Sequence, residues 1–149
     1  MIALIENARA KMEYSFDEEL QAGIVLSGGE VKMLRSHRGS LVGSHVVILG
    51  SDAVLVNAQI PAYPFSREEE YDPKRSRRLL LHKNEILKLA QAIETKGLSV
   101  IPVSIGISGR HLKVRIAIAR GKKQYERREE LKRRDMDREA LREHKMRVR

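Results

Sequence analysis

The chain has 149 residues, a net charge of +9 and no cysteine, and 42% of its residues are hydrophobic. This length and apolar content predict one domain with a sizeable core and room for an appendage. The lack of cysteine excludes disulfides and thiolate metal sites, and no run of about 18 apolar residues is present that could span a membrane. The first residues, MIALIENARAK, have no basic segment before their short apolar run, so we expect no secretory signal and a cytoplasmic location.

Regular patterns begin in the first half of the chain. Residues 18–27, EELQAGIVLS, combine alternation with β-branched side chains, which is typical of a strand. Residues 30–38 carry apolar residues at helical spacing and are followed by a glycine, so a short helix is predicted. Residues 46–49 and 53–56 are rich in β-branched residues and flank Gly-Ser-Asp, which predicts a hairpin.

The second half begins with a long loop and ends in two strands. Prolines and a polar run place the loop over about residues 61–77, before a leucine triplet. Residues 82–97 then have apolar side chains on one helical face and end at a glycine. His82 or Asn84 is the expected N-cap of this helix, and Glu85 would complete a capping box with His82. Residues 98–107 and 112–119 are predicted strands, joined by a turn.

The last predicted strand has one apolar and one basic face, because Leu, Val and Ile alternate there with Lys113, Arg115 and Ala117. At least five strands and two helices are expected, and the clear strand connections are hairpins, which favours an antiparallel sheet. A chain of this size with one sheet often closes it. We therefore predict a mainly β fold, a small antiparallel barrel with short flanking helices.

The positive charge is concentrated at the C-terminal end. Residues 120–149 carry 13 basic and 7 acidic residues, whereas residues 1–119 carry 16 and 13. This asymmetry indicates a polyanionic partner, with nucleic acid the first candidate and an anionic membrane surface the second. The tail has few large apolar residues, so we expect it to be disordered when free and helical on its partner. The alternative is a tail that only improves solubility.

No constellation of residues predicts catalysis. Glu68, Glu69, Glu70 and Asp72 are close in sequence to His82, but adjacent carboxylates in one loop point apart, so a solvated loop is favoured over a metal site. The five histidines show no paired spacing, and neither a GxSxG nor a phosphate-loop motif occurs. The Gly-Gly pair before the first helix could bind a phosphate at the helix N-terminus, although a simple turn is the favoured interpretation. We expect neither enzyme activity, nor a cofactor, nor a metal.

The segment DPKRSRRLLLHK places basic residues directly before the leucine triplet. Such a loop, held beside a rigid strand, is suited to contact a phosphate backbone. An ordinary solvated loop explains the same residues equally well. The basic residues concerned are Lys74, Arg75, Arg77 and Arg78.

Several blocks together resemble one family. ENARAKMEY, AGIVLSGGEVKMLR, DPKRSRRLLLHKNEI, KGLSVIPV and KVRIAIARGKKQYERREELKRRD occur in this order through nearly the whole chain. In this respect the chain is similar to the small protein B family, the bacterial proteins that bind transfer-messenger RNA in trans-translation. The resemblance implies an OB-like antiparallel barrel over residues 1–120 and a basic tail over residues 121–149. It also implies a non-enzymatic monomer whose partners are transfer-messenger RNA and the stalled ribosome, with no membrane partner.

The resemblance also implies roles for particular residues. Leu80 and Lys113 match positions important for RNA binding, and Gln21 stands where the family has an acidic residue just before the Ala-Gly of the first strand. Met12 stands where a histidine is usual. With Gly23 and the basic loop, the expected RNA-binding residues are Gln21, Gly23, Leu80, Lys113, Arg75 and Arg77. The tail residues expected to act in the messenger channel and decoding centre are Gly121, Lys122, Lys123, Tyr125, Leu131, Lys132, Arg133 and Met136.

Two other functions compete with this one. A generic OB-type protein that binds ribosomes or structured RNA would have the same charge distribution without a role in ribosome rescue. A hydrolase that uses Glu70 and Asp72 is a more distant alternative.

Overall fold

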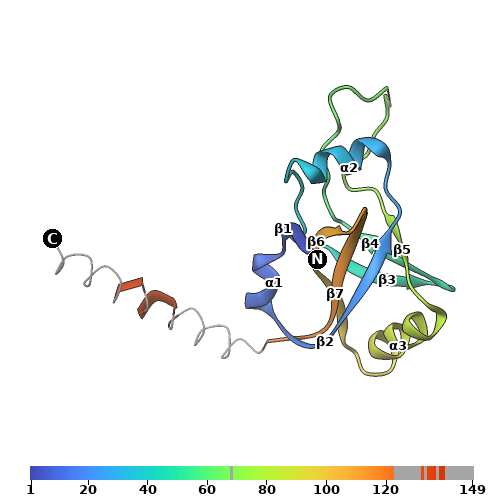
Figure 1. The fold of residues 1–149 in the computed structure, drawn as a ribbon. Helices are drawn as coiled ribbons and strands as arrows, with labels where there is room; N and C mark the ends of the chain where they lie inside the picture. The colour runs from blue at the N-terminus through green and yellow to red at the C-terminus, as the bar shows by residue number, and fades with distance from the viewer. Residues whose placement is uncertain (68, 123–131, 133, 137, 140–149) are drawn as a thin grey trace.

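The computed structural model describes residues 1–67, 69–122, 132, 134–136 and 138–139. Within them the fold is mainly β: one antiparallel sheet with short helices at its margins (Figure 1). In chain order the elements are β1 (Ile2–Glu6), α1 (Ala8–Glu13), β2 (Tyr14–Ile24), α2 (Gly28–Arg35), β3 (His45–Leu49), β4 (Asp52–Val56), β5 (Arg77–Leu80), α3 (Lys83–Glu94), β6 (Ser99–Ser108) and β7 (His111–Gly121).

The sheet is not closed, so the predicted barrel is wrong. The strands follow the order β1-β6-β7-β2-β5-β4-β3, and within the described chain no ladder joins the edge strands β1 and β3. The reason lies along β6. Its residues 104–107 pair with β1, but its first part, residues 99–102, pairs only with β7. Pro102 also has no N–H to donate to a further strand.

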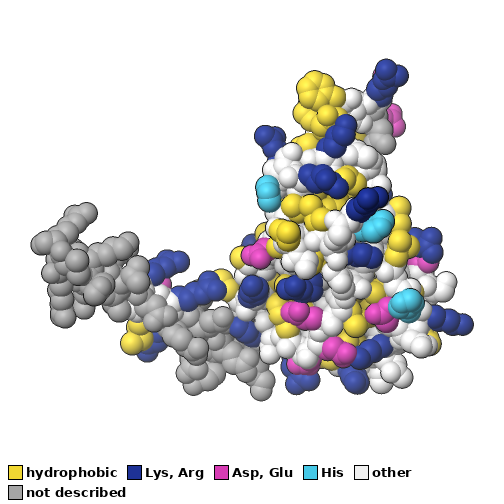
Figure 2. All heavy atoms as spheres, in the orientation of Figure 1, with side chains coloured by type: hydrophobic (Ala, Val, Ile, Leu, Met, Phe, Trp, Pro, Cys, Tyr) yellow, Lys and Arg dark blue, Asp and Glu magenta, His cyan; other side chains and the backbone are white. Residues whose placement is uncertain are grey.

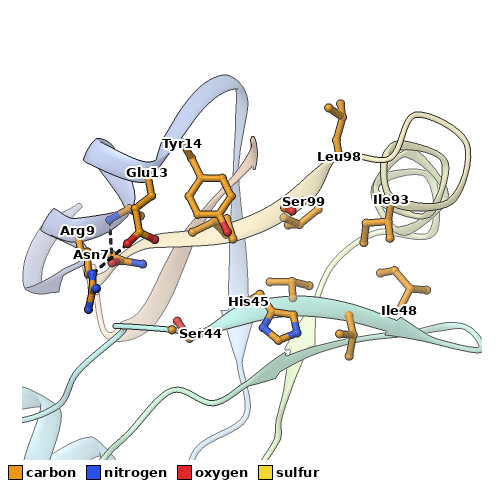
Figure 3. A pocket seen from close by; sticks show the side chains of 16 residues that line it. Asn7, Arg9, Glu13, Tyr14, Ser44, His45, Ile48, Ile93, Leu98 and Ser99 are labelled. Atoms are coloured by element: carbon orange, nitrogen blue, oxygen red, sulfur yellow. Dashed lines mark hydrogen bonds and ion pairs between the residues drawn. The ribbon is translucent and has the colours of Figure 1, made fainter. Parts of the chain in front are cut away.

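A cavity of about 340 Å³ lies where β3 faces the first part of β6. Figure 3 shows Ile48, Ile93 and Leu98 at one end of the cavity and Arg9 and Glu13 at the other. The guanidinium of Arg9 and the carboxylate of Glu13 form an ion pair of 3.0 Å, so these two charges neutralise each other. The cavity therefore marks the seam at which side chains, rather than backbone hydrogen bonds, connect the two ends of the sheet.

The alternation predicted for the last strand is confirmed on the inner face of β7, where Val114, Ile116 and Ile118 are buried. On the outer face Ala117 and Ala119 are buried as well. Ala119 belongs to a second apolar cluster with Ala10 of α1 and Ile101 of β6, so α1 covers this end of the outer face. The basic, solvent-facing part of β7 is consequently shorter than the sequence indicates.

The patterns predicted the long elements but missed the short elements β1, α1 and β5. The six residues of α1 are too few to show helical periodicity. The helix begins at Asn7, whose side chain is buried: its Oδ1 accepts from the backbone N–H of Ala10 at 3.3 Å, and its Nδ2 donates to Pro102 O at 2.9 Å and Leu41 O at 3.3 Å. One side chain thus ties α1 to β6 and to the segment before β3.

The predicted hairpin is confirmed as β3 and β4, and the predicted second helix as α3. His82 is the N-cap of α3, and the Glu85 carboxylate accepts its backbone N–H at 2.9 Å, as expected. The first of the two predicted helices corresponds to α2, which begins two residues earlier than predicted. Ser27 caps it with a hydroxyl that accepts the N–H of Glu30 at 3.2 Å, and the Glu30 carboxylate accepts the N–H of Ser27 at 2.9 Å.

Candidate nucleic-acid interface

Three of the predicted RNA-binding residues lie side by side across the centre of the sheet. In the strand register Gly23 of β2 pairs with Leu80 of β5 on one side and with Lys113 of β7 on the other. Directly opposed residues of antiparallel strands point to the same face, and Gln21, two residues before Gly23, shares that face. The structure therefore brings together Gln21, Gly23, Leu80 and Lys113. We call this set the outer row.

The outer row surrounds a shallow hollow of about 390 Å³. Its wall also includes Leu81, His82 and Glu85, which follow β5 and begin α3. The sequence pattern predicts a capping role for His82 and Glu85 but gives no sign that they belong to an RNA-binding face. His82 and Glu85 lie in this wall because β5 leads directly into α3, which places the first turn of the helix beside Leu80.

Glycine at position 23 opens the hollow. A Cβ on Gly23 would lie 3.1 Å from the Cβ of Leu80, closer than nearly all such contacts in proteins. A side chain at position 23 would therefore crowd Leu80 and require it to shift. Leu80 lies on the outer face of β5, and 53% of its surface is exposed to solvent.

Lys113 differs from the other basic residues nearby. The early part of β2 carries Asp17, Glu18 and Glu19, and these carboxylates form ion pairs with Arg120 at 3.9 Å, with Lys88, and with Arg115 at 3.7 Å, respectively. Among the described residues, the Lys113 ammonium makes no hydrogen bond or ion pair. Figure 2 shows this face, with basic side chains spread along it and acidic ones gathered toward its lower end. An ammonium without a carboxylate partner is available to a phosphate group.

The prediction that Arg77 contacts RNA is wrong. Its side chain has no exposed surface, and its Nε lies 2.6 Å from Glu30 Oε2. Its Nη1 donates to the carbonyl oxygens of Ala58 at 2.7 Å and Arg75 at 3.1 Å, and its Nη2 donates to the hydroxyl of Tyr71 at 3.0 Å. With every nitrogen bonded inside the protein, Arg77 has no donor left for a phosphate.

Arg75 is only partly available. Its side chain is 36% exposed, but its Nη2 and Nε both bond the Glu30 carboxylate, the latter at 3.1 Å. Tyr71 OH also lies 3.0 Å from Glu30 Oε2, so two arginines and a tyrosine converge on one buried carboxylate. This buried network fixes the loop before β5 against α2. Its role is to position the strand that carries Leu80.

The charge of Glu30 is strongly stabilised. Burial raises its pKa, but hydrogen bonds from Arg75, the backbone of Ser27 and Arg77, with the positive charge of Arg77, lower the pKa more, from 4.5 to about 2. Burial and the neighbouring Glu30 carboxylate also raise the pKa of Tyr71. A carboxylate at the N-terminus of α2 opposes an incoming anion, so the geometry favours the simple turn over a phosphate site at Gly28-Gly29.

The residues predicted to act in the tail are only partly described. β7 ends at Gly121, which pairs with Tyr14. The next residue, Lys122, donates hydrogen bonds to α1: its backbone N–H to Glu13 O at 2.9 Å and its Nζ to Lys11 O at 3.0 Å. Lys132 and Met136 are helical and exposed, and Met136 has 62% of its surface accessible. Lys123, Tyr125, Leu131 and Arg133 lie outside the described residues, and their roles stay predictions.

The described residues also test the alternatives to RNA binding. Among them no three His, Asp or Glu side chains are grouped so that they could hold a metal ion, and this includes Glu69, Glu70, Asp72 and His82. None of the helices in the described part of the chain has the length and apolar character needed to cross a membrane. An antiparallel sheet with a lysine-bearing, glycine-opened outer face fits the class of RNA-binding proteins.

Comparisons with known proteins identify the family. The model of the SmpB protein family matches residues 4–146. The SsrA-binding protein of Chloroflexus aggregans is 41% identical over 145 residues, covering 97% of this chain and 92% of that protein. The SsrA-binding protein of Zymomonas mobilis is 41% identical over 140 residues, covering 93% and 88% of the two chains. The chain belongs to the SmpB family, a family of RNA-binding proteins without enzymatic activity. This confirms the predicted family and the prediction that the protein is not an enzyme.

A solved structure supports the same assignment. It is described as "tmRNA-SmpB: a journey to the center of the bacterial ribosome", and it is 39% identical to this chain with a TM-score of 0.67. The match covers 80% of this chain and 84% of the solved one.

Proposed function

We propose that this protein binds the tRNA-like domain of transfer-messenger RNA through the outer row and delivers that RNA to stalled ribosomes in trans-translation. Membership of the SmpB family and relatives named SsrA-binding protein support the RNA partner. The observation that carries the site is the register Leu80–Gly23–Lys113, which places an exposed apolar side chain and an unpaired ammonium on either side of an open glycine. Apolar contact with a base and charge contact with a phosphate are the two terms that RNA binding combines.

We further propose a division of labour near Gly121. Residues 1–120 form the RNA-holding unit, and residues 121–149 form a basic tail that lies in the empty messenger channel and is read at the decoding centre. The charge distribution supports this, because the tail has nearly twice as many basic as acidic residues. We also propose that the protein acts as a monomer in the cytoplasm.

Truncation after Lys122 tests the division. This cut keeps the pairing of Gly121 with Tyr14 and both bonds of Lys122 to α1. We expect the truncated protein to bind the tRNA-like domain within about twofold of the full chain and with the same salt dependence, since the division places the phosphate contacts to this RNA in residues 1–120. We expect it to support no peptide tagging on stalled ribosomes. Loss of RNA binding by the truncated protein would contradict the division.

A generic RNA-binding protein is the second candidate, since a basic face alone binds phosphate backbones without regard to sequence. The exposed Leu80 and the hollow beside it favour the specific function, because an apolar floor adds nothing to contacts with phosphates. A generic binder would hold unrelated structured RNAs as tightly as the tRNA-like domain.

A further inference from the structure

The C-terminal turn of α1 contacts the tail at three consecutive residues. The carbonyl oxygens of Lys11 and Glu13 accept hydrogen bonds from the Nζ and the backbone N–H of Lys122, at 3.0 Å and 2.9 Å respectively. Between them in sequence, the Sδ of Met12 accepts a hydrogen bond from Nη1 of Arg134 at 3.1 Å. Figure 1 shows the chain leaving β7 on the side of the sheet where α1 lies. One turn of helix therefore contacts the tail at its start and again further along.

The C-terminal end of a helix is a suitable partner for a lysine. The last carbonyl groups of a helix have no N–H partner within the helix, and they carry a partial negative charge. In α1 the N–H of the C-cap residue, Tyr14, bonds Ala10 O, which leaves the later carbonyls to other donors. Lys122 satisfies two of them at once, and its positive charge is favoured at this end of the helix.

α1 is fixed to the sheet, so its last turn has a defined place. A helix of six residues is too short to be stable by itself, and its position comes from its tertiary contacts. The buried side chain of Asn7 bonds Pro102 O of β6 at the start of the helix. Ala10 packs with Ile101 and Ala119 on the outer face of the sheet. A segment bonded to the end of α1 is thereby placed relative to the whole sheet.

We propose that the C-terminal turn of α1, residues 11–13, is a cradle that sets the direction in which the tail leaves the folded unit, with Lys122 as the positioning residue. The inference rests on the proposed function, in which the tail enters the messenger channel while residues 1–120 hold the RNA. A tail joined to the sheet through Gly121 alone would leave in many directions, because glycine restricts the backbone least. Contacts with α1 reduce these directions and so raise the fraction of the protein that is ready to engage the channel.

Hydrogen exchange at residue 122 measures the cradle in the free, full-length protein. Lys122→Ala removes the ammonium but keeps the backbone N–H that bonds Glu13 O. A cation at a helix C-terminus typically favours the bound state by about two- to fivefold. Exchange of this amide, corrected for its intrinsic rate, should therefore be faster by about that factor. Lys122→Arg should keep the slow rate, because a guanidinium also donates to carbonyl oxygens.

Distance measurements between two spin labels test the direction of the tail. The chain has no cysteine, so cysteines introduced at Lys96 and Glu139, both exposed, carry the only labels. The distance distribution should widen in Lys122→Ala and widen further when Arg134→Ala is added, since both contacts with α1 are then lost. Lys11→Ala is the matched control for both experiments. It removes an exposed lysine side chain but leaves the carbonyl that accepts from residue 122, so exchange and distances should stay as in wild type.

Peptide tagging on stalled ribosomes connects the cradle to the function. At limiting protein concentration, Lys122→Ala should lower tagging by up to about fivefold, and Lys122→Arg should restore it. Equal losses in the two variants would show that a lysine is needed by the partner and would overturn the positioning role.

The outcomes separate the cradle from the function beneath it. Unchanged exchange at residue 122 in Lys122→Ala, or an unchanged width of the distance distribution, would overturn the cradle and leave delivery of the RNA by this protein standing. A wild-type protein that supported no tagging would overturn the proposed function, whereas exchange and distances would still decide whether α1 holds the tail.

Discussion

Arg77 and Leu80 lie three residues apart on β5, and each occupies the place that its chemistry would assign to the other. The arginine is fully buried, and the leucine is 53% exposed. Side chains alternate along the strand, so Arg77 shares the inner face with Leu79 and Leu80 shares the outer face with Arg78. The strand's alternation, rather than the polarity of each residue, decides which of them meets the partner.

The inner position tolerates an arginine because the buried carboxylate of Glu30 pairs with it. A buried charge is tolerated only when it is paired and hydrogen-bonded, and Arg77 has Glu30 together with several carbonyl oxygens. The outer position tolerates a leucine because that surface is shaped for a ligand. Arg77 therefore holds β5 in place, whereas Leu80 is placed by β5 on the surface that faces a ligand.

The largest expected effect is that of Arg77→Ala on stability. It removes the fully buried cation that is paired with the buried Glu30 carboxylate, and removing one partner of such a pair costs about 3–5 kcal/mol. Urea unfolding measures the loss. Arg78→Ala is the matched control: its side chain is exposed and makes a surface ion pair with Asp52, so we expect a change of less than about 1 kcal/mol. If the two variants were equally stable, the buried network would not be holding the strand.

The next pair of variants sets adjacent leucines against each other. Leu79→Ala removes a side chain that is only 2% exposed, so it should lower the free energy of unfolding by about 2–5 kcal/mol. Leu80→Ala should change stability by less than about 0.5 kcal/mol but weaken binding of the tRNA-like domain about fivefold, since covering its exposed apolar surface contributes about 1 kcal/mol. Unfolding curves and filter binding on the same preparations measure both quantities. A Leu80→Ala variant that lost stability and kept its affinity would refute the assignment of the outer face.

Acid should weaken the fold through Glu30. Its folded pKa, about 2, lies below the ordinary value of 4.5, so its contribution to stability is complete above pH 4.5 and is lost as pH falls toward 2. A difference of this size corresponds to about 3 kcal/mol. Urea unfolding at several pH values should show a steeper loss in this window for wild type than for Glu30→Gln. Parallel pH profiles for the two proteins would show that Glu30 does not carry this dependence.

A smaller effect should distinguish two cations on β7. Lys113→Ala should weaken RNA binding about tenfold and reduce the slope of affinity against salt by about 1, as expected for the loss of one phosphate contact. Arg115→Ala is the matched control, because that exposed guanidinium already has Glu19 as a partner. Titrations at several salt concentrations measure both slopes. Equal slopes for the two variants would mean that the whole strand, rather than Lys113, contacts RNA.

The smallest effect on the fold is expected at the start of the tail. Changing Lys122 and Lys123 together to alanine removes a surface hydrogen bond to Lys11 O, which contributes about 1 kcal/mol or less. Thermal unfolding should therefore move by only a few degrees and RNA affinity should stay near that of wild type, whereas peptide tagging should fall sharply. A large drop in Tm would instead assign this pair to the folded unit.

Local patterns were enough to predict the elements whose signals are local. The hairpin around Gly50 and the helix from Lys83 follow from turn residues and apolar periodicity, and alternation along β7 put Lys113 on the wet face. The importance of Leu80 and Gln21 came from the family resemblance, and the register then explained why they belong with Gly23. The burial of Arg77 was not predictable in this way, because it depends on Glu30, 47 positions earlier in the chain. The open sheet was not predictable for the same reason. It depends on how many residues of β6 pair with β1, and these strands lie about 100 residues apart in the sequence.

We propose that the outer row recognises one RNA rather than phosphate charge in general. Competition binding at fixed salt, with labelled tRNA-like domain displaced by unlabelled tRNA-like domain or by ordinary tRNA, tests it most directly. We predict that ordinary tRNA competes poorly against wild-type protein and that Leu80→Ala, folded as stably as wild type, loses much of this preference. Equal displacement of wild-type protein by the two RNAs would contradict the claim.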